Sequence, residues 1–292
     1  MLQETLIRRL LAAIAAVSLL ALGGIMLFLF MEGLPLFSNH SVIGFLFGEF
    51  WYPTAEPPEF GIFPLLAGSL AVTVLASCIA VPLGVLTAAY LTEIALPPVR
   101  RVVKPFIELL AALPSVVIGF FGMVIVAPLL QDHLDISTGL NLFNAGLMLA
   151  FMSVPTICSV AEDALFAVPR SLREASLALG ATRWETTARV VLPAALSGIG
   201  TAVMLGMSRA IGETMVVLMV AGGAAMLPTS IFDPVRPMPA SIAAEMAEAP
   251  FRGEHYYALF AIGIVLFLFT LAFNVLAQRI AERHRQAGSA SL

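Results

Sequence analysis

Charged residues are scarce in this 292-residue chain, and their scarcity excludes a soluble globular protein. Asp, Glu, Lys and Arg make up 12% of the sequence and hydrophobic residues 60%, with a mean hydropathy of +0.97. A soluble domain usually covers its surface with about 25% charged residues. We therefore expect most of the surface of this chain to face lipid.

Residues that build disulfides, metal centres and nucleotide sites are also few. The two cysteines, Cys78 and Cys158, lie inside apolar runs and indicate no disulfide framework. The four histidines show no spacing typical of a metal site, and no Gly-x-x-x-x-Gly-Lys phosphate loop is present. There is no basic patch suited to nucleic acid. We therefore expect no metal or cofactor, and no ATP hydrolysis through a phosphate loop on this chain.

Six apolar runs are long enough to cross a bilayer as helices, which needs about 20 residues each. The first run is too long for the apolar core of a signal peptide and has no small-x-small cleavage site before Glu32, so we interpret it as a retained helix. The sequence therefore predicts an all-α membrane protein. The six expected spans are Leu10–Met31, Leu66–Leu91, Phe106–Leu130, Leu142–Val160, Leu196–Ala221 and Tyr257–Gln278.

The distribution of basic residues predicts the orientation of these spans. Twelve Lys and Arg residues flank them on one side, whereas the opposite loops carry only Arg236 and Arg252. Basic residues accumulate on the cytoplasmic side of membrane proteins, so both termini are expected in the cytoplasm. The twelve residues are Arg8, Arg9, Arg100, Arg101, Lys104, Arg170, Arg173, Arg183, Arg189, Arg279, Arg283 and Arg285.

The two long outer loops differ in character. The 32–64 loop carries Trp51 and Tyr52, aromatic residues that suit the membrane interface. The 222–256 loop contains a helical pattern, Ser241–Glu248, between proline-rich flanks. We expect a short helix there, at the outer mouth.

The cytoplasmic loop between the fourth and fifth spans has the pattern of two short helices. Ser171 with Glu174, and Thr182 with Glu185, fit capping boxes. Gly180 stands where the first helix should end in a left-handed conformation. The expected product is a compact helix–turn–helix. Its small residues, Ala175, Ser176 and Ala178, would let another surface approach closely. Pro193 would open the fifth span.

The same loop resembles the signature loop of permeases in bacterial ABC importers. That signature is Glu-Ala-Ala, three residues, Gly, nine residues, then Ile-x-Leu-Pro. Here it appears as Glu174-Ala175-Ser176, Gly180 and Val190-Val191-Leu192-Pro193, with Ser for Ala and Val for Ile. The resemblance implies that the loop is the coupling helix that docks on a dimer of separate ATPase subunits. For Glu174 taken alone, a simple helix cap is the less favoured alternative.

Four further segments carry a narrower resemblance: Glu108–Gly119, Glu162–Leu165, Arg209–Thr214 and Ser241–Met246. This resemblance is to PstC-like permeases of the high-affinity phosphate importer. It covers most of Pro64–Ile280 and implies a type I importer fold, in which a five-helix core is preceded by an extra helix. The expected division is an N-terminal helix and periplasmic loop (1–63), the core (64–280) and a cytoplasmic tail (281–292). The resemblance also implies a second, similar permease and a periplasmic phosphate-binding protein as partners.

Arg209 is the leading candidate for the substrate pathway. It lies sixteen residues after Pro193, or about 24 Å along a helix, near mid-membrane. A central Arg costs roughly 2.5–3.5 kcal/mol to insert, so it needs a partner or a task. Glu213 is four residues further on, which leaves a packing ion pair and an anion-binding charge both open. Ser208 and Thr214 flank this pair and complete the proposed pathway set.

Four other carboxylates lie near the cytoplasmic ends of the expected spans. We interpret these as interfacial groups paired with nearby Lys or Arg, not as pathway residues. They are Glu93, Glu108, Glu162 and Asp163.

Three alternative functions stay open at this point. A permease for sulfate, molybdate or tungstate would share the coupling loop, and Arg209 would suit any of these anions. An ATP-independent secondary transporter or channel would have no use for the loop between Glu174 and Pro193. A non-transporting sensor subunit is the third alternative.

The orientation yields a labelling prediction. A cysteine introduced at Thr54 or Asp233 should react with a reagent confined to the outside, whereas one at Thr186 or Ser289 should not. Mass spectrometry of the labelled chain reads out the result. Reaction at Thr186 from outside would overturn the orientation.

Overall fold

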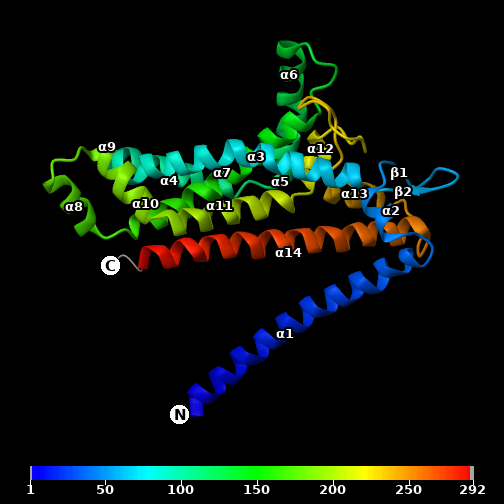
Figure 1. Ribbon diagram of the computed structural model, residues 1–292, viewed down its shortest axis with the longest axis horizontal. Coiled ribbons are helices and arrows are strands. Elements are labelled where there is room, and N and C mark those ends of the chain that lie inside the picture. Colours follow the sequence, from blue (N-terminus) through cyan, green and yellow to red (C-terminus); the bar gives the residue numbers. More distant parts are fainter. Residues whose placement is uncertain (1, 290–292) are drawn as a thin grey trace.

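Four long helices lie side by side and form the body of the molecule (Figure 1). They are α3 (Phe63–Ala89), α7 (Leu142–Phe166), α11 (Leu196–Ile211) and α14 (Glu254–Ser289). The computed structural model describes the backbone of residues 2–289 and the side chains of residues 7–279. The all-α prediction is confirmed, and only one short hairpin interrupts the helices in the described chain.

The remaining elements extend this bundle at both ends and on its flanks. Two short outer elements, η1 and α2, and the antiparallel strands β1 and β2 fill much of the first outer loop. The bounds are α1 Leu2–Gly33, η1 Leu34–Ser38, α2 Val42–Phe47, β1 Trp51–Tyr52, β2 Glu59–Phe60, η2 Tyr90–Ile94, α4 Pro97–Ala111, α5 Ser115–Phe121, η3 Gly122–Val126, α6 Ala127–Leu134, α8 Arg170–Ala178, α9 Arg183–Thr186, η4 Thr187–Val191, α10 Leu192–Ala194, α12 Met215–Val220 and α13 Met238–Glu245.

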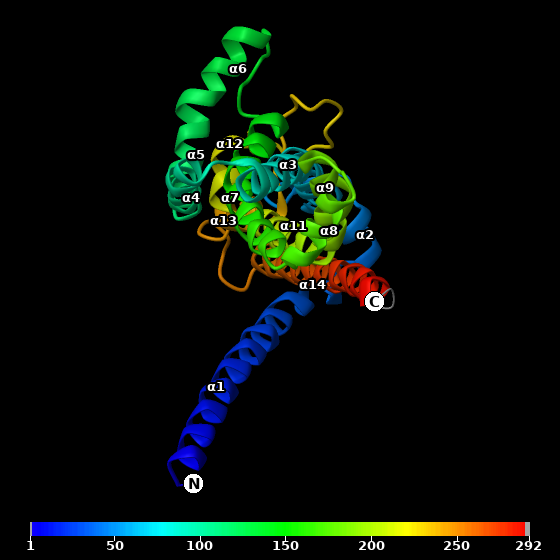
Figure 2. The same cartoon turned by 90° about the vertical axis from the view of Figure 1, so that its left-hand side faces the viewer.

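Helix α1 diverges from the bundle and meets it near one end (Figures 1 and 2). The rings of Phe28 and Phe260 pack edge to face there, with centroids 5.6 Å apart. Further back along α1, Leu19 and Leu20 are 70% and 75% exposed. Such apolar exposure needs lipid or another subunit to cover it. The helix predicted at Leu10–Met31 is present as part of α1.

The third predicted span, Phe106–Leu130, is wrong in its boundaries. The chain leaves the helix after Ala111 and resumes at Ser115, and the apolar candidate span runs Ser115–Leu134. Pro114 explains the break, because a proline disfavours helical geometry in the residue before it. Helix α4 runs along the bundle, whereas α6 projects away from it (Figures 1 and 2).

The fifth predicted span, Leu196–Ala221, is also not one continuous helix. Helix α11 ends at Ile211, α12 begins at Met215, and the residues between them form a break. Before it, the segment Arg183–Ala194 meets α11 at 71°. Pro193 therefore lies just before a bend and does not open a straight span. The described chain has five apolar helices long enough to span a membrane, or six with this bent pair.

The end of the bundle beside the β-hairpin is tied together by the carboxylate of Glu245, in α13. It accepts hydrogen bonds from the Trp51 indole at 3.1 Å and from Arg236 at 2.5 Å. The His255 ring contacts it at 2.9 Å. One side chain thus links the β-hairpin, the loop before α13 and the start of α14. The short helix predicted within Ser241–Glu248 is confirmed as α13, with earlier boundaries.

A second carboxylate orders the tip of the same outer loop. Asp233 accepts hydrogen bonds from the hydroxyl and N–H of Thr229 and from the N–H of Ser230. The Thr229 hydroxyl, followed by these backbone donors, lowers the pKa of the Asp233 carboxyl below its usual value. The loop is therefore a folded outer element with internal hydrogen bonds.

Close packing of the bundle centres on Ile157 of α7. A Cβ on Gly84 of α3 would lie 2.7 Å from this side chain, and one on Gly206 of α11 would lie 2.4 Å from it. Glycine at both positions lets α3 and α11 approach α7 closely, as small residues do in membrane helix packing. The buried Leu149 and Met152 continue this core along α7.

The C-terminal part of α7 carries a buried charge cluster. The Glu162 side chain on α7 is 2% exposed and lies 2.9 Å from Arg100 and 3.2 Å from Lys104, both on α4. Arg100 also stacks on the ring of Phe166, 3.9 Å from its centroid. The paired-carboxylate prediction is confirmed for Glu162. It is also confirmed for Glu93, which pairs with Arg173 at 2.8 Å, whereas Glu108 and Asp163 form no salt bridge with a described side chain.

The Glu162 cluster predicts a specific loss of stability. Glu162→Gln should destabilise the chain by about 2 kcal/mol, because it leaves two cations with one neutral acceptor; their partial exposure reduces the cost of a fully buried pair. Thermal unfolding in detergent measures the change. The matched control is Asp163→Asn, which alters an exposed neighbouring carboxylate. Equal melting temperatures for the two variants would contradict the role given to Glu162.

Candidate functional site: a docking loop and a broken helix

Two short helices, α8 and α9, project at one end of the bundle beside the C-terminal end of α14 (Figure 1). Gly180 lies between them with φ +85°, a conformation that other residues rarely adopt. The capping box of Thr182 and Glu185 is confirmed, with N–H to side-chain bonds of 3.2 and 2.9 Å. The one predicted for Ser171 and Glu174 is wrong. Helix α8 begins after Pro169, whose side chain has no acceptor.

The outer surface of this loop is apolar as well as small. Ala175 and Ala178 are exposed as expected, whereas Ser176 is half-buried and its hydroxyl lies 2.9 Å from that of Thr186. Leu179 is 89% exposed and Trp184 64% exposed. Exposed large apolar side chains beside the turn indicate a surface that another protein covers.

Arg173 fixes this loop to the bundle. Its guanidinium donates to the backbone oxygens of Val168 and Leu165, at 2.5 and 2.8 Å, and pairs with Glu93 beyond the end of α3. These contacts attach the start of α8 to the end of α7 and to η2, which continues α3. Sequence reasoning treated Arg173 only as a topology signal and missed this role. Its place just after the fourth span, near the free carbonyls of a helix end, could have indicated it.

The remaining coupling-motif residues occupy distinct positions. Glu174 is exposed, and Leu192 and Pro193 lie in α10, at the bend that leads into α11. Because Thr186 is 3% exposed, its exposed neighbour Thr182 is the better position for the cysteine labelling test. The motif thus reaches from the exposed loop into the helix that carries Arg209.

The predicted pathway residues lie at and just before the break between α11 and α12. Arg209 lies in the last turn of α11 and is exposed. Glu213 does not pair with it: no described carboxylate is within 4 Å of Arg209 in a salt bridge. Glu213 instead accepts from the N–H groups of Met215 and Val216, at 3.2 and 3.4 Å. It therefore caps the start of α12, where a negative charge is favoured.

Ser208 and Thr214 make separate contacts. The Ser208 hydroxyl donates to the side-chain oxygen of Asn274 on α14 at 2.5 Å. The Thr214 hydroxyl donates to the carbonyl of Gly212 at 3.4 Å. The structure thus brings all four predicted residues to one break but gives them different partners.

A groove lined by both polar and apolar side chains runs along α11 from Ser208 toward the segment Arg170–Thr186, which contains α8 and α9 and is called the docking loop below. Its volume is about 620 Å³, and α7 and α14 form its walls. Sequence reasoning missed these polar residues, although Asn274 and Gln278 stand four apart in an apolar run and so share a helix face. Polar side chains at membrane depth indicate contact with water or with another protein. The polar lining is Ser197, Thr201, Ser208, Asn274 and Gln278.

The family comparison covers most of the chain. A family model described as the binding-protein-dependent transport system inner membrane component matches residues 80–286. The match includes the docking loop and the break at Gly212.

Several curated proteins are similar over most of their length. The probable ABC transporter permease protein YqgH of Bacillus subtilis is 38% identical, over 95% of this chain and 91% of that protein. The phosphate transport system permease protein PstC of Mesorhizobium japonicum is 36% identical, over 93% of this chain and 88% of that protein. PstC of Pasteurella multocida is 39% identical, over 77% of this chain and 75% of that protein.

Solved structures share the fold. A chain of a bacterial alginate ABC transporter matches with a TM-score of 0.69 at 16% identity, over 96% of this chain and 95% of that chain. An inward-facing MetNI methionine ABC transporter chain matches with a TM-score of 0.58 at 22% identity, over 77% of this chain and 94% of that chain. At these identities the likeness concerns the fold alone. Together with the family match and the curated relatives, it leads to one conclusion: the chain belongs to the family of binding-protein-dependent transport system inner membrane components.

Proposed function

We propose that this chain is a permease subunit of an ABC importer and moves inorganic phosphate into the cytoplasm. The observation that carries the proposal is the docking loop. Its motif residues fold as α8 and α9 around Gly180, with Leu179 and Trp184 exposed. An ATPase dimer on separate subunits would dock there and supply the energy, while this chain performs no catalysis.

Phosphate is the substrate favoured by the relatives. Proteins named phosphate transport system permease PstC are 32–39% identical to this chain. Arg209 can meet an oxyanion because it is exposed and has no carboxylate partner among the described side chains. A periplasmic phosphate-binding protein would select the ligand, so the permease needs only a low barrier for it.

A second permease is the expected partner at the exposed apolar surfaces. Helix α1 and the α5–α6 arm both leave the bundle (Figure 2), and Val117 and Phe120 on α5 are 51% and 55% exposed. The groove along α11 that ends at Ser208 would then be closed by the partner chain. We place this assembly in the bacterial inner membrane with both termini in the cytoplasm, as the basic residues predict.

The alternatives make different demands. A sulfate, molybdate or tungstate permease would keep the same loop, and binding measurements with the associated periplasmic protein separate these anions from phosphate. An ATP-independent transporter would need no docking surface at Leu179. A sensor subunit would keep signalling when Arg209 is replaced, without any need for uptake.

The docking loop predicts a separable coupling defect. Gly180→Pro should weaken ATPase docking, because proline cannot adopt the positive φ of Gly180. Glu174→Arg should do the same by placing a bulky cation on the exposed face of α8. Co-purification of the ATPase measures docking, and surface labelling confirms insertion. Wild-type co-purification together with normal uptake in both variants would contradict the assignment.

The break predicts transport loss without loss of assembly. In the double variant Arg209→Gln with Glu213→Gln, the new amide oxygen can still accept from the N–H groups of α12, so the chain should fold and bind its ATPase. Phosphate uptake should nevertheless fail while basal ATP hydrolysis continues. Uptake and hydrolysis in vesicles measure this, with Glu213→Gln alone as the control. Near-normal uptake by the double variant would show that Arg209 is not a pathway residue.

A further inference from the structure

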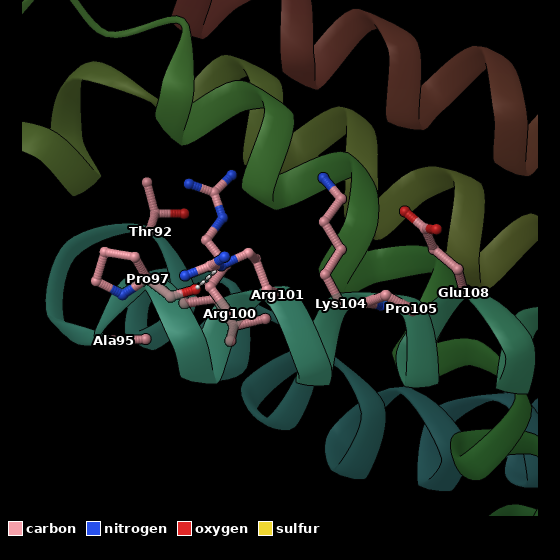
Figure 3. A pocket seen from close by; sticks show the side chains of 9 residues that line it. Thr92, Ala95, Pro97, Arg100, Arg101, Lys104, Pro105 and Glu108 are labelled. Carbon is pink, nitrogen blue, oxygen red and sulfur yellow. Dashed lines mark hydrogen bonds between the residues drawn. The ribbon is translucent and has the colours of Figure 1, made fainter.

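A second groove lies at the cytoplasmic half of the bundle, between η2 and α4. Its volume is about 730 Å³, and Arg100, Arg101, Lys104 and Glu108 line it with part of η2. Figure 3 shows these four side chains extending from one side of α4. The function proposed above does not use this groove.

The charges in the groove do not balance. Arg100 and Lys104 share the buried carboxylate of Glu162, which holds both in place at 2.9 and 3.2 Å. Arg101 is exposed, and its recorded hydrogen bond is a long one, 3.4 Å, to the carbonyl of Pro97 in its own helix. Three cations thus face one buried carboxylate, with Glu108 at the far end of the groove. The surplus is positive beside Arg101, which suits an anion with several oxygens.

The faces of α4 indicate which surroundings the groove meets. Val103 and Ile107 pack inward against the bundle. Val102, Phe106 and Leu109 form an exposed apolar stripe, at 58%, 64% and 66% exposure. On a regular helix this stripe lies about 130° away from the face that carries Arg101, Lys104 and Glu108. If the apolar stripe meets lipid or another subunit, the charged face turns toward an aqueous space.

We infer that this groove is an inner phosphate site, where an inorganic phosphate released from the pathway is held by Arg101 with Arg100 and Lys104 before it enters the cytoplasm. The inference rests on the proposed function. The groove on α4 would be a second cationic anion-binding site, in addition to the one at Arg209. Helix α4 leads through the Ala112–Pro114 break into α5, and Gly119 of α5 packs against Met219 of α12. A phosphate bound in the groove can therefore affect the position of α12, the helix that follows the pathway break.

The experiment uses the assembled complex with its binding protein in phosphatidylcholine vesicles that contain ATP and a range of internal phosphate concentrations. The initial rate of labelled phosphate import is measured. An inner site predicts that internal phosphate slows import, since it occupies the station from which imported phosphate must leave. Arg101→Gln should raise the internal phosphate concentration for half-inhibition by about tenfold, the usual worth of one charge-assisted contact. Arg101→Lys should stay close to the wild type.

Arg8→Gln is the matched control. It replaces an exposed arginine on α1, far from the groove, and should leave half-inhibition unchanged. Unchanged half-inhibition in Arg101→Gln, or equal effects in the two Gln variants, would overturn the inference. A lipid headgroup is the competing source of phosphate. If internal phosphate has no Arg101-dependent effect in phosphatidylcholine, while added phosphatidylglycerol changes import by the wild type and not by Arg101→Gln, the groove holds lipid and the inner-site inference is wrong.

The experiment distinguishes failure of the proposed function from failure of the inner phosphate site. If the wild-type complex imports no phosphate at all, the proposed function is wrong. If it imports phosphate but internal phosphate has no effect at the concentrations that fill a weak site, only the inner site is wrong. Direct binding of labelled phosphate to wild-type and Arg101→Gln complexes in phosphatidylcholine discs gives an independent reading, with several-fold weaker binding expected for the variant.

Discussion

The structure depends on one constraint: a polar group in the apolar interior of a membrane protein must be satisfied by the protein or by water. Glu162 meets it with Arg100 and Lys104, which fixes α4 to α7. The backbone break before α12 meets it through Glu213, which accepts from two free N–H groups. Arg209 is the exception, exposed and without a described salt bridge. An unpaired cation at such a place is where an anion can interact.

The docking loop and the groove along α11 are connected through the same stretch of chain. Arg173 holds the docking loop to the ends of α3 and α7, so movement of α8 is transmitted into the bundle. The motif continues through Pro193 to the 71° bend that begins α11. The bend and the break enclose the one helix that carries both the polar groove and Arg209. A helix hinged at both ends is suited to move when an ATPase moves the loop.

The sequence predicted the features that rest on strong local rules. Long apolar runs located the spans of α3, α7 and α14, because lipid demands such runs. Gly180 and the box of Thr182 and Glu185 were found because positive φ and helix capping have clear residue preferences. The interpretation of Ser171 as a cap failed because α8 begins two residues earlier, after Pro169.

What the sequence could not give depends on tertiary contacts. The breaks at Ala112–Pro114 and Gly212–Thr214 lie inside apolar runs, and the hydropathy of each run predicts one continuous helix. An i, i+4 spacing suggested that Arg209 faces Glu213, but the helix stops between them. The link from Ser208 to Asn274 joins residues 66 positions apart, and no local pattern reveals such a pair.

The most direct test of the account is ATP-driven accumulation by the purified wild-type complex in vesicles, with phosphate, sulfate and molybdate compared. The account predicts accumulation of phosphate that requires ATP and the binding protein; accumulation without ATP, or of another oxyanion in preference to phosphate, would contradict it.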